Sequence, residues 1–382
     1  MDMRLMPLSK LEFQQLAYDF AKKLGIAHKF NDVTGKAGGS FYYGFMKRHP
    51  DLALKKPNNT SIERVNGFNV DAVKVFFDKL IILLEEYQFQ PSQIYNGDES
   101  GITPVQKNSK VISLKGKKNV AKMTSGEKGE NVTVMLCGNA EGDLLPPFFI
   151  LKKHNKSIAA QFAENLPPNA EMYMGSSSWQ TTDSFAQWLR FFIHQVQPEA
   201  LKPVLLIVDG HASHKTLDAI TLAQENHVQM LSLPPNTTHK MQPLDRCFMA
   251  SFKKAYGQAC EKLMRELNGG KLITKDVSLL ARNALNSMEA RVPVNLIKGF
   301  QVTGIEPFDR DIFKNELNVA EVNQPESANR AMKSILNEIM PLPAKKPVKK
   351  TNRTQTSEIL TSAAYIQNKM QKSRKVTSKT VV

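Results

Sequence analysis

Val204-Leu-Leu-Ile-Val-Asp-Gly-His-Ala-Ser-His214 opens with five aliphatic residues in a row and then places a carboxylate before a glycine. An apolar run of this length, rich in β-branched residues, is typical of a buried strand. A second apolar run, 228–233, leads into Pro234-Pro-Asn-Thr-Thr-His-Lys-Met-Gln-Pro-Leu-Asp245. Residues 215–225 between the two runs have a helical pattern, so we expect a right-handed crossover that joins two parallel strands. Asp209 and Asp245 are therefore predicted to lie at one edge of a sheet.

Further strand patterns precede this unit. Gln93-Ile-Tyr-Asn-Gly-Asp-Glu-Ser-Gly101 is predicted to be a strand that ends at Asp98. Residues 132–137 and 144–151 are apolar and flank a glycine-bounded turn, which predicts a hairpin. Residues 152–178 are polar and contain prolines, so we expect an irregular surface excursion there. A helix follows at Thr182 or Asp183, and its apolar side chains recur at a spacing that favours the core over base stacking: Phe185, Trp188, Leu189 and Phe192.

This order of elements predicts an α/β fold with a mixed sheet, because hairpin strands pair antiparallel and crossover strands pair parallel. Asp98 and Asp209 come together if their two strands pair at the centre of the sheet, and Asp245 would complete a cluster. Crowded carboxylates need a cation to stay ionised, and two Mg²⁺ or Mn²⁺ ions about 4 Å apart would meet that need. Aspartates in turns or helix caps are the alternative interpretation of the same residues.

Composition points to a polyanionic partner. The 382 residues carry a net charge of +15, and 41% of them are hydrophobic. Membrane surfaces and acidic proteins are alternative partners for such a charge. Residues 343–382 hold ten Lys or Arg and one Glu, and we expect 321–382 to be a basic, disordered tail. Lys345-Lys-Pro-Val-Lys-Lys350 suits either a nuclear-import signal or a solvating linker.

The cysteine count and the length of the apolar runs indicate the redox compartment of the protein and whether it crosses a membrane. The three cysteines are odd in number, which predicts reduced thiols in an intracellular protein. No apolar run reaches the roughly 18 residues of a membrane span, so we expect no membrane partner.

Short helices with basic ends are predicted in the first 70 residues. Ser9 and Glu12 have the spacing of a capping box before an amphipathic helix, and a second helix follows the glycine-rich segment 35–39. Basic side chains that suit DNA contact cluster near these helices: Lys47, Arg48, Lys55, Lys56 and Arg64. A solvated charged face would show the same pattern.

An extended segment at 107–128 adds more lysines, among them Lys115, Lys117 and Lys118. They suit either a nucleic-acid surface or the protection of an exposed sheet edge.

Three motifs in order support a family resemblance. Tyr95-Asn-Gly-Asp-Glu-Ser-Gly101, Val208-Asp-Gly-His-Ala-Ser-His214 and Leu233-Pro-Pro-Asn-Thr-Thr-His-Lys-Met-Gln-Pro-Leu-Asp245 resemble the DDE endonuclease domain of pogo/Tigger/Jerky-type transposases of the Tc1/mariner group. The last two acids are 36 positions apart, within that group's usual range. Phe45-Met-Lys-Arg-His-Pro50 and its neighbours resemble the second half of a CENP-B-type helix-turn-helix, whose first half would precede residue 1.

The resemblance covers roughly residues 8–310 and implies an RNase H-like mixed sheet flanked by helices, with a small all-α helix-turn-helix unit before it. The domains it implies are 1–70 for the partial DNA-binding unit, 71–90 for a connecting helix and 91–310 for the endonuclease domain.

Carried over by position, the resemblance implies that Asp98, Asp209 and Asp245 bind the metal ions and act in catalysis. His211 and His214 would support them by orienting a carboxylate or contacting phosphate. A zinc site formed by these two histidines with Cys247 is a minor alternative, because no fourth ligand has suitable spacing.

The resemblance implies a nuclear, DNA-binding transposase or transposase-derived protein, which hydrolyses phosphodiesters and transfers strands at element ends. Double-stranded DNA is the expected partner, and a homodimer is left open. The rival hypothesis is a host-adopted, non-catalytic DNA-binding protein on the same scaffold, so whether this chain is an enzyme also stays open. A small-molecule α/β enzyme is disfavoured, because the chain lacks a Gly-x-Gly-x-x-Gly after a strand and a Gly-x-Ser-x-Gly elbow.

Overall fold

The computed structural model describes residues 7–57, 61–105, 112–113, 115, 130–318, 338 and 356–377. The chain divides into two compact units, one of residues 1–61 with 313–354 and one of residues 62–312 with 355–382. The helix α3 (Ile62–Gly67) and the expected connecting helix α4 (Val70–Tyr87) both group with the second unit. The observed division therefore falls at residue 61, whereas we expected the DNA-binding unit to run to residue 70.

The first unit is built from helices, as predicted. It holds α1 (Lys10–Lys23), α2 (Gly39–Arg48) and α12 (Lys314–Asn318). α1 begins at the expected capping box, in which the Ser9 backbone N–H donates to Glu12 Oε2 at 2.8 Å. Phe13 on α1 packs against Phe45 on α2, with ring centroids 4.6 Å apart.

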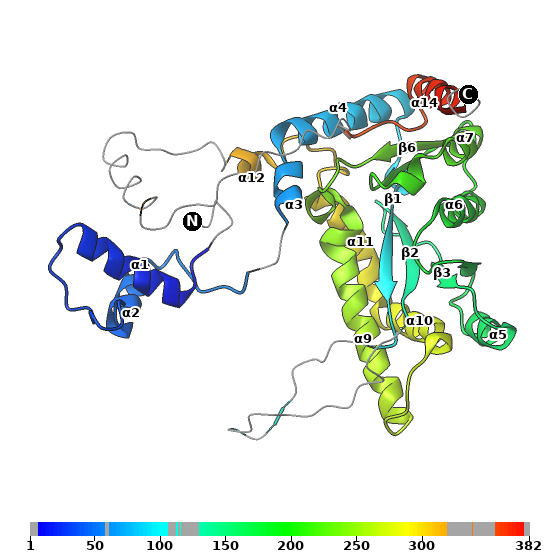
Figure 1. The fold of residues 1–382 in the computed structure, drawn as a ribbon. Coiled ribbons are helices and arrows are strands. Elements are labelled where there is room, and N and C mark those ends of the chain that lie inside the picture. The colour runs from blue at the N-terminus through cyan, green and yellow to red at the C-terminus, as the bar shows by residue number, and fades with distance from the viewer. Residues whose placement is uncertain are drawn as a thin grey trace. The chain divides into compact units, whose positions relative to one another are not determined.

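A six-stranded mixed sheet organises the second unit (Figure 1). Its strands lie in the order β4-β3-β2-β1-β5-β6. β1 pairs antiparallel with β2 and β2 with β3, whereas β3–β4, β1–β5 and β5–β6 are parallel pairs. A three-stranded meander with a parallel crossover pair beside its first strand is the RNase H-like order, so the predicted fold class is confirmed. The strand bounds are β1 (Ile94–Ile102), β2 (Val132–Asn139), β3 (Phe148–Lys152), β4 (Glu171–Gly175), β5 (Val204–Val208) and β6 (Val228–Ser232).

Helices cover both faces of this sheet (Figure 1). On one face, α9 (Met249–Glu266) and α10 (Val277–Met288) pack Phe252, Tyr256 and Leu280 against the sheet. On the other face, α6 (Thr182–Val196) and α7 (Leu217–Glu225) pack Trp188 and Ile220. All four predicted apolar side chains of α6 are buried, so they belong to the core as expected. The remaining helices of this unit are α5 (Lys156–Glu164), α8 (Thr238–Met241), α11 (Val292–Val302) and α14 (Ala363–Thr377).

The first strand is longer than predicted. β1 continues to Ile102 because residues 99–102 still pair with residues 132–135 of β2. Asp98 lies opposite Leu136 and is therefore inside the strand, and the prediction that the strand ends at Asp98 is wrong.

The segment 152–178 is also more ordered than predicted. It holds α5, which begins at an Asn155 cap, and β4, which pairs in parallel with β3. The prediction of an irregular excursion is wrong for these two elements. β4 is an edge strand whose residues are exposed or half-buried, so its sequence lacks the apolar run by which a central strand is recognised.

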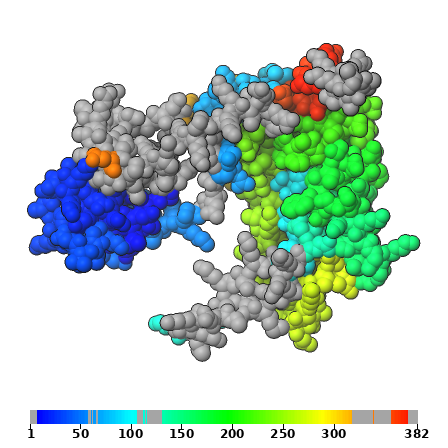
Figure 2. Space-filling view, viewed as in Figure 1, coloured from blue at the N-terminus to red at the C-terminus, as the bar shows by residue number. Residues whose placement is uncertain are grey.

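Part of the predicted tail is folded. Leu360 is buried and its N–H donates to Met230 O of β6 at 2.8 Å, while Ile359 bridges Leu231. α14 then packs on α7 (Figures 1 and 2). The prediction of disorder is therefore wrong for residues 356–377, because a few apolar side chains within a basic composition cover the β6 edge. Residues 319–337, 339–355 and 378–382 lie outside the described residues.

Candidate functional site

Three elements carry the predicted acids. Asp98 lies on β1, Asp209 directly follows β5, and Asp245 lies on η4, a π-helical turn over Leu244–Phe248. β1 and β5 are neighbours at the centre of the sheet, with Asn96 opposite Ile207. The predicted central pairing is therefore confirmed. π-helical turns are rare and often mark functional sites.

A buried asparagine joins these three elements. Asn96 is fully buried. Its Nδ2 donates to Ile207 O at 2.9 Å, and its Oδ1 accepts from the Leu244 N–H at 3.1 Å. Asn96 thus ties β1 to points two residues before Asp209 and one residue before Asp245. We did not predict this role from the sequence, although an amide within the apolar start of a central strand was a signal for it.

A close helix contact backs the turn that carries Asp245. Gly299 of α11 lies so near that an added Cβ would stand 2.5 Å from Pro243 O. Only glycine permits this approach, because real Cβ atoms do not come within 3.0 Å of a backbone oxygen.

The side chains of Asp98 and Asp245 lie close enough for each to affect the pKa of the other. Burial raises the pKa of Asp98 well above its usual range, and the charges of Asp245, Glu99 and Asp209 add to the rise. Loss of water also raises the pKa of Asp245, although its side chain keeps an exposed side. Carboxylates crowded in this way cannot both ionise without cost unless a cation is present. The structure thus brings these two predicted acids into contact.

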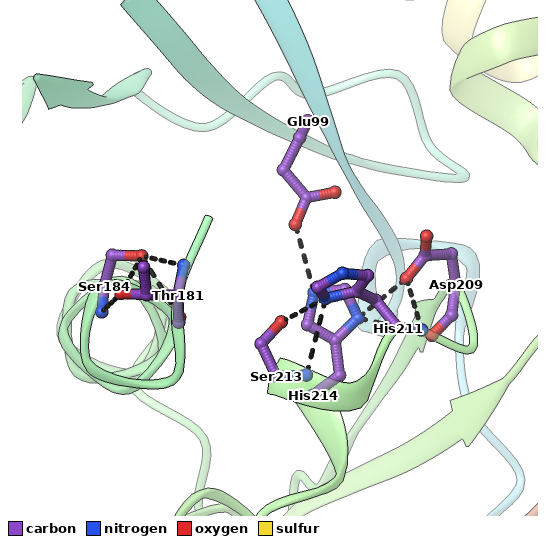
Figure 3. Close-up of polar contacts among 7 residues, drawn as sticks. All are labelled: Glu99, Thr181, Ser184, Asp209, His211, Ser213 and His214. Atoms are coloured by element: carbon purple, nitrogen blue, oxygen red, sulfur yellow. Dashed lines mark hydrogen bonds and ion pairs between the residues drawn. The ribbon is translucent and has the colours of Figure 1, made fainter. Parts of the chain in front are cut away.

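Asp209 instead contacts a buried histidine (Figure 3). His214 Nδ1 lies 2.9 Å from Asp209 Oδ1, and its Nε2 lies 3.0 Å from Glu99 Oε1. The His211 backbone N–H also donates to Asp209 Oδ1 at 2.9 Å. His214 contacts Asp209, and its second carboxylate partner, Glu99, was missed. The Asp-Glu pair in the first motif was the available signal.

His214 is a buried cation held by its two carboxylates. It is 1% exposed and its ring lies 4.2 Å from that of Phe185. Burial alone would lower its pKa, but the hydrogen bonds and charges of Asp209 and Glu99 raise the pKa to about 10. Burial would raise the pKa of Asp209, but the hydrogen bond and charge of His214, together with the backbone hydrogen bond and charge of His211, hold that pKa below its usual value.

The second supporting histidine behaves differently. His211 is exposed and its Nδ1 lies 2.8 Å from Ser213 Oγ (Figure 3). Its side chain shapes the turn that follows Asp209.

The donor chemistry of this site suits a hard divalent cation. Asp98, Asp209 and Asp245 supply carboxylate oxygens only, the ligands that Mg²⁺ and Mn²⁺ prefer. The raised pKa values of Asp98 and Asp245 mark buried acids, and at Asp98 a local excess of negative charge, that a cation would relieve. Within the described part of the chain, no three His, Cys, Asp or Glu side chains already stand around one ion position. This holds equally for the zinc alternative with Cys247.

The predicted DNA-contacting residues fall into separate groups. Lys47 and Arg48 end α2, and Lys55 and Lys56 follow it; all four are exposed in the first unit. Arg64 is exposed on α3 of the sheet unit, close enough to act on the charge of Asp245.

The lysines of the 107–128 segment largely escape description. Lys115 is exposed, whereas Lys117 and Lys118 lie outside the described residues.

Known proteins resemble this chain over part of its length. Residues 129–291 match the family described as DDE superfamily endonuclease, a range that includes Asp209 and Asp245 and begins after Asp98. Tigger transposable element-derived protein 7 of Homo sapiens is 24% identical over 267 residues, which cover 65% of this chain and 45% of that protein. A Cochliobolus lunatus protein named MFS-type transporter clz9 is 28% identical over 238 residues, which cover 61% of this chain and 25% of that protein.

A solved structure adds a distant neighbour. The Mos1 mariner paired end complex with Mn is 15% identical, with a TM-score of 0.40 over 77% of this chain and 72% of that one. The chain spans less than half the length of the curated relatives named above. Across the described ranges, no helix is both long and apolar enough to cross a membrane.

Proposed function

We propose that this chain, in which residues 129–291 form a DDE superfamily endonuclease domain, is a DNA-binding transposase or transposase-derived protein that hydrolyses phosphodiesters at element ends and transfers the cut strand. The observation that carries the proposal is the placement of three carboxylates on neighbouring elements: Asp98 lies on β1, Asp209 follows the adjacent β5, and Asp245 lies on the turn that Asn96 ties to β1. Their cost without a cation is best explained by a site built for one.

Asp98, Asp209 and Asp245 would hold two Mg²⁺ or Mn²⁺ ions. When bound, such ions supply an activated water or 3′-hydroxyl and stabilise the leaving oxygen. The residues of the chain orient the acids. His214 fixes the rotamer of Asp209 through a 2.9 Å contact, and Asn96 holds β5 and η4 at a set spacing from β1.

Double-stranded DNA is the proposed partner. Lys47, Arg48, Lys55 and Lys56 give the first unit an exposed basic surface, which suits backbone phosphates. With this partner, the nucleus is the proposed location, and a homodimer would let two chains hold two element ends.

A nicking assay tests the proposal. Purified protein is incubated with labelled duplex DNA and Mg²⁺ or Mn²⁺, beside Asp209→Asn and Asp245→Asn. The matched control is Asp218→Asn, an exposed aspartate in the first turn of α7. We expect metal-dependent nicking in the parent and in the control, and background signal in the two site variants. Nicking that survives both site substitutions would rule out these acids.

The rival is a non-catalytic DNA-binding protein on the same scaffold, which the exposed basic surface of the first unit would equally support. The same assay decides between the two: salt-dependent DNA binding by a parent protein that nicks with neither metal would establish the rival.

A further inference from the structure

A segment near the C-terminus pairs with the edge of the sheet as a short extra strand. Residues 357–362, here named the strap, lie against both β6 and α4 and lead into α14 (Figure 1). The Ser232 N–H donates to Glu358 O at 3.0 Å, and the Leu360 N–H donates to Met230 O at 2.8 Å. The strap therefore follows the last residues of β6.

Ser232, the last residue of β6, is where the strap holds that strand most closely. Ser232 is fully buried. Its Oγ accepts from the Glu358 N–H at 2.9 Å and lies 3.4 Å from Glu358 O. Together with the backbone bond, three hydrogen bonds join these two residues. The end of β6 cannot shift without leaving buried polar groups unpaired, which is unfavourable.

A cation and an apolar side chain anchor the strap. Lys79 of α4 is half-buried, and its Nζ donates to Glu358 Oε2 at 2.8 Å and also to Ser357 O. Leu360 is fully buried in the core that α6 and α7 share with the sheet. The strap thus has a polar and an apolar anchor, and both belong to the sheet unit.

The residue after Ser232 contacts the turn that carries Asp209. The Leu233 N–H donates to Val208 O at 2.9 Å. Leu233 O also lies beside Gly210, where an added Cβ would stand 3.6 Å from it. Leu233 thus contacts the residues on both sides of Asp209. A shift of Ser232 would reach Asp209 through Leu233, because successive residues share a rigid peptide unit.

We infer that the strap positions the carboxylate of Asp209, so that the C-terminal part of this chain belongs to the acid site. The inference rests on the proposed function, which makes Asp209 a metal ligand. The alternative is a strap that only covers the β6 edge and keeps it from pairing with another chain. The two differ in what happens at Asp209 when the strap is loosened.

The test loosens the strap in the full chain. Lys79→Met removes the anchoring cation and keeps most of the apolar stem. Lys79→Arg keeps a cation with several donors and is the conservative variant. Ser232→Ala loosens the strap from the other side, because it removes the two hydrogen bonds of Oγ. Lys74→Met is the control, since Lys74 is exposed on the same helix.

Hydrogen exchange of the metal-free proteins gives the first readout, in peptides 356–362 and 206–214. The second peptide reports on Asp209, because it contains the His211 N–H that donates to Asp209 Oδ1 at 2.9 Å. We expect Lys79→Met and Ser232→Ala to speed exchange about tenfold in both peptides, as loss of a hydrogen bond that limits local opening would do. Lys79→Arg and Lys74→Met should match the parent.

Two outcomes of the exchange experiment overturn the inference. Faster exchange confined to peptide 356–362 would mean that the strap only covers the edge of β6. Unchanged exchange in both peptides, in Lys79→Met and in Ser232→Ala, would mean that these contacts do not hold the strap.

Titration calorimetry with Mn²⁺ gives the second readout. Lys79→Met and Ser232→Ala should each raise the Kd about three- to tenfold, at or below the lower end of the range for residues that orient metal ligands. The double variant should match the single ones, because the two side chains act in one line of contacts. A Kd that stays at the parent value overturns the inference alone. A parent that binds no Mn²⁺ overturns the proposed function, while the exchange of peptide 206–214 still decides whether the strap positions Asp209.

Discussion

Replacement of Asn96 by alanine should separate the acid-bearing segments of this protein. The substitution removes the amide that donates to Ile207 O and accepts from the Leu244 N–H. Both partners are buried. β5 and η4 then lose the contact that fixes the positions of Asp209 and Asp245 relative to β1.

The magnitude follows from the two groups left without a partner. Each buried polar group that loses its hydrogen bond costs about 1–3 kcal/mol. Asn96→Ala should therefore lower the free energy of unfolding by about 2–6 kcal/mol. Residues that orient the ligands of a metal typically change affinity by about 10- to 100-fold, so we expect the Kd for Mn²⁺ to rise within that range.

The assay combines thermal unfolding with isothermal titration of Mn²⁺ at a temperature where each protein is folded. Asn139→Ala is the matched control. Asn139 is also buried in the sheet, where it lies opposite Tyr95 near the start of β1. Its amide hydrogen-bonds to Asp143 of the hairpin instead of to the segments that carry Asp209 and Asp245. We expect the control to lose stability and to keep the parent's Mn²⁺ affinity. If folded Asn96→Ala binds Mn²⁺ as tightly as the parent, Asn96 does not set the spacing of the acids.

Three other changes have opposite or selective effects. Asp98→Asn should raise the Tm of the metal-free protein at pH 7 by at least about 2–4 °C, because it removes a carboxylate whose pKa is raised by burial and by its acidic neighbours. The substitution should also abolish the rise in Tm that Mn²⁺ causes. A lower metal-free Tm would contradict the crowding of these acids. Gly299→Ala should lower the free energy of unfolding by about 1–3 kcal/mol and slow nicking, because the added Cβ displaces Pro243. Gly257→Ala is the control and should do neither, since a Cβ there meets nothing within 4 Å. Equal effects of the two substitutions would refute the close contact at Gly299. Because the pKa of His214 is raised to about 10, the stability that its charge contributes is complete below pH 6.5 and is lost as pH rises towards 10. Tm values should therefore fall across that pH range in the parent and stay nearly flat in His214→Asn. An unchanged fall in the variant would place the titrating group elsewhere.

Apolar runs predicted the central strands because a strand buried on both faces consists of consecutive apolar residues. The runs at 204–208 and 228–233 and the hairpin at 132–151 gave the strand order, and the order placed Asp98 beside Asp209. The edge elements had no such signal. β4 is paired on one side only, and the strand-like contact of Ile359 lies within a basic composition.

The sequence predicted which structural element carries each acid, but it did not predict which side chains contact the acids. Positions after strands follow from topology, so Asp209 and Asp245 could be assigned to one edge of the sheet, whereas Asp98 was assigned to the right strand but lies within it. Which side chains contact each other depends on packing between distant segments. Glu99 reaches His214 across 115 positions, and Asn96 reaches Leu244 across 148. Arg64 shows the same limit, because its charge pattern suited a helix-turn-helix while packing at Gly67 places it in the sheet unit.

The site itself can be observed directly. Anomalous diffraction from crystals grown with Mn²⁺ would locate the ions without dependence on a DNA sequence or on turnover. We predict anomalous density for two ions within ligand distance of carboxylate oxygens of Asp98, Asp209 and Asp245, with Asn96 still bonded to Leu244. Full Mn²⁺ occupancy elsewhere, with no anomalous density within ligand distance of Asp98, Asp209 or Asp245, would contradict the account.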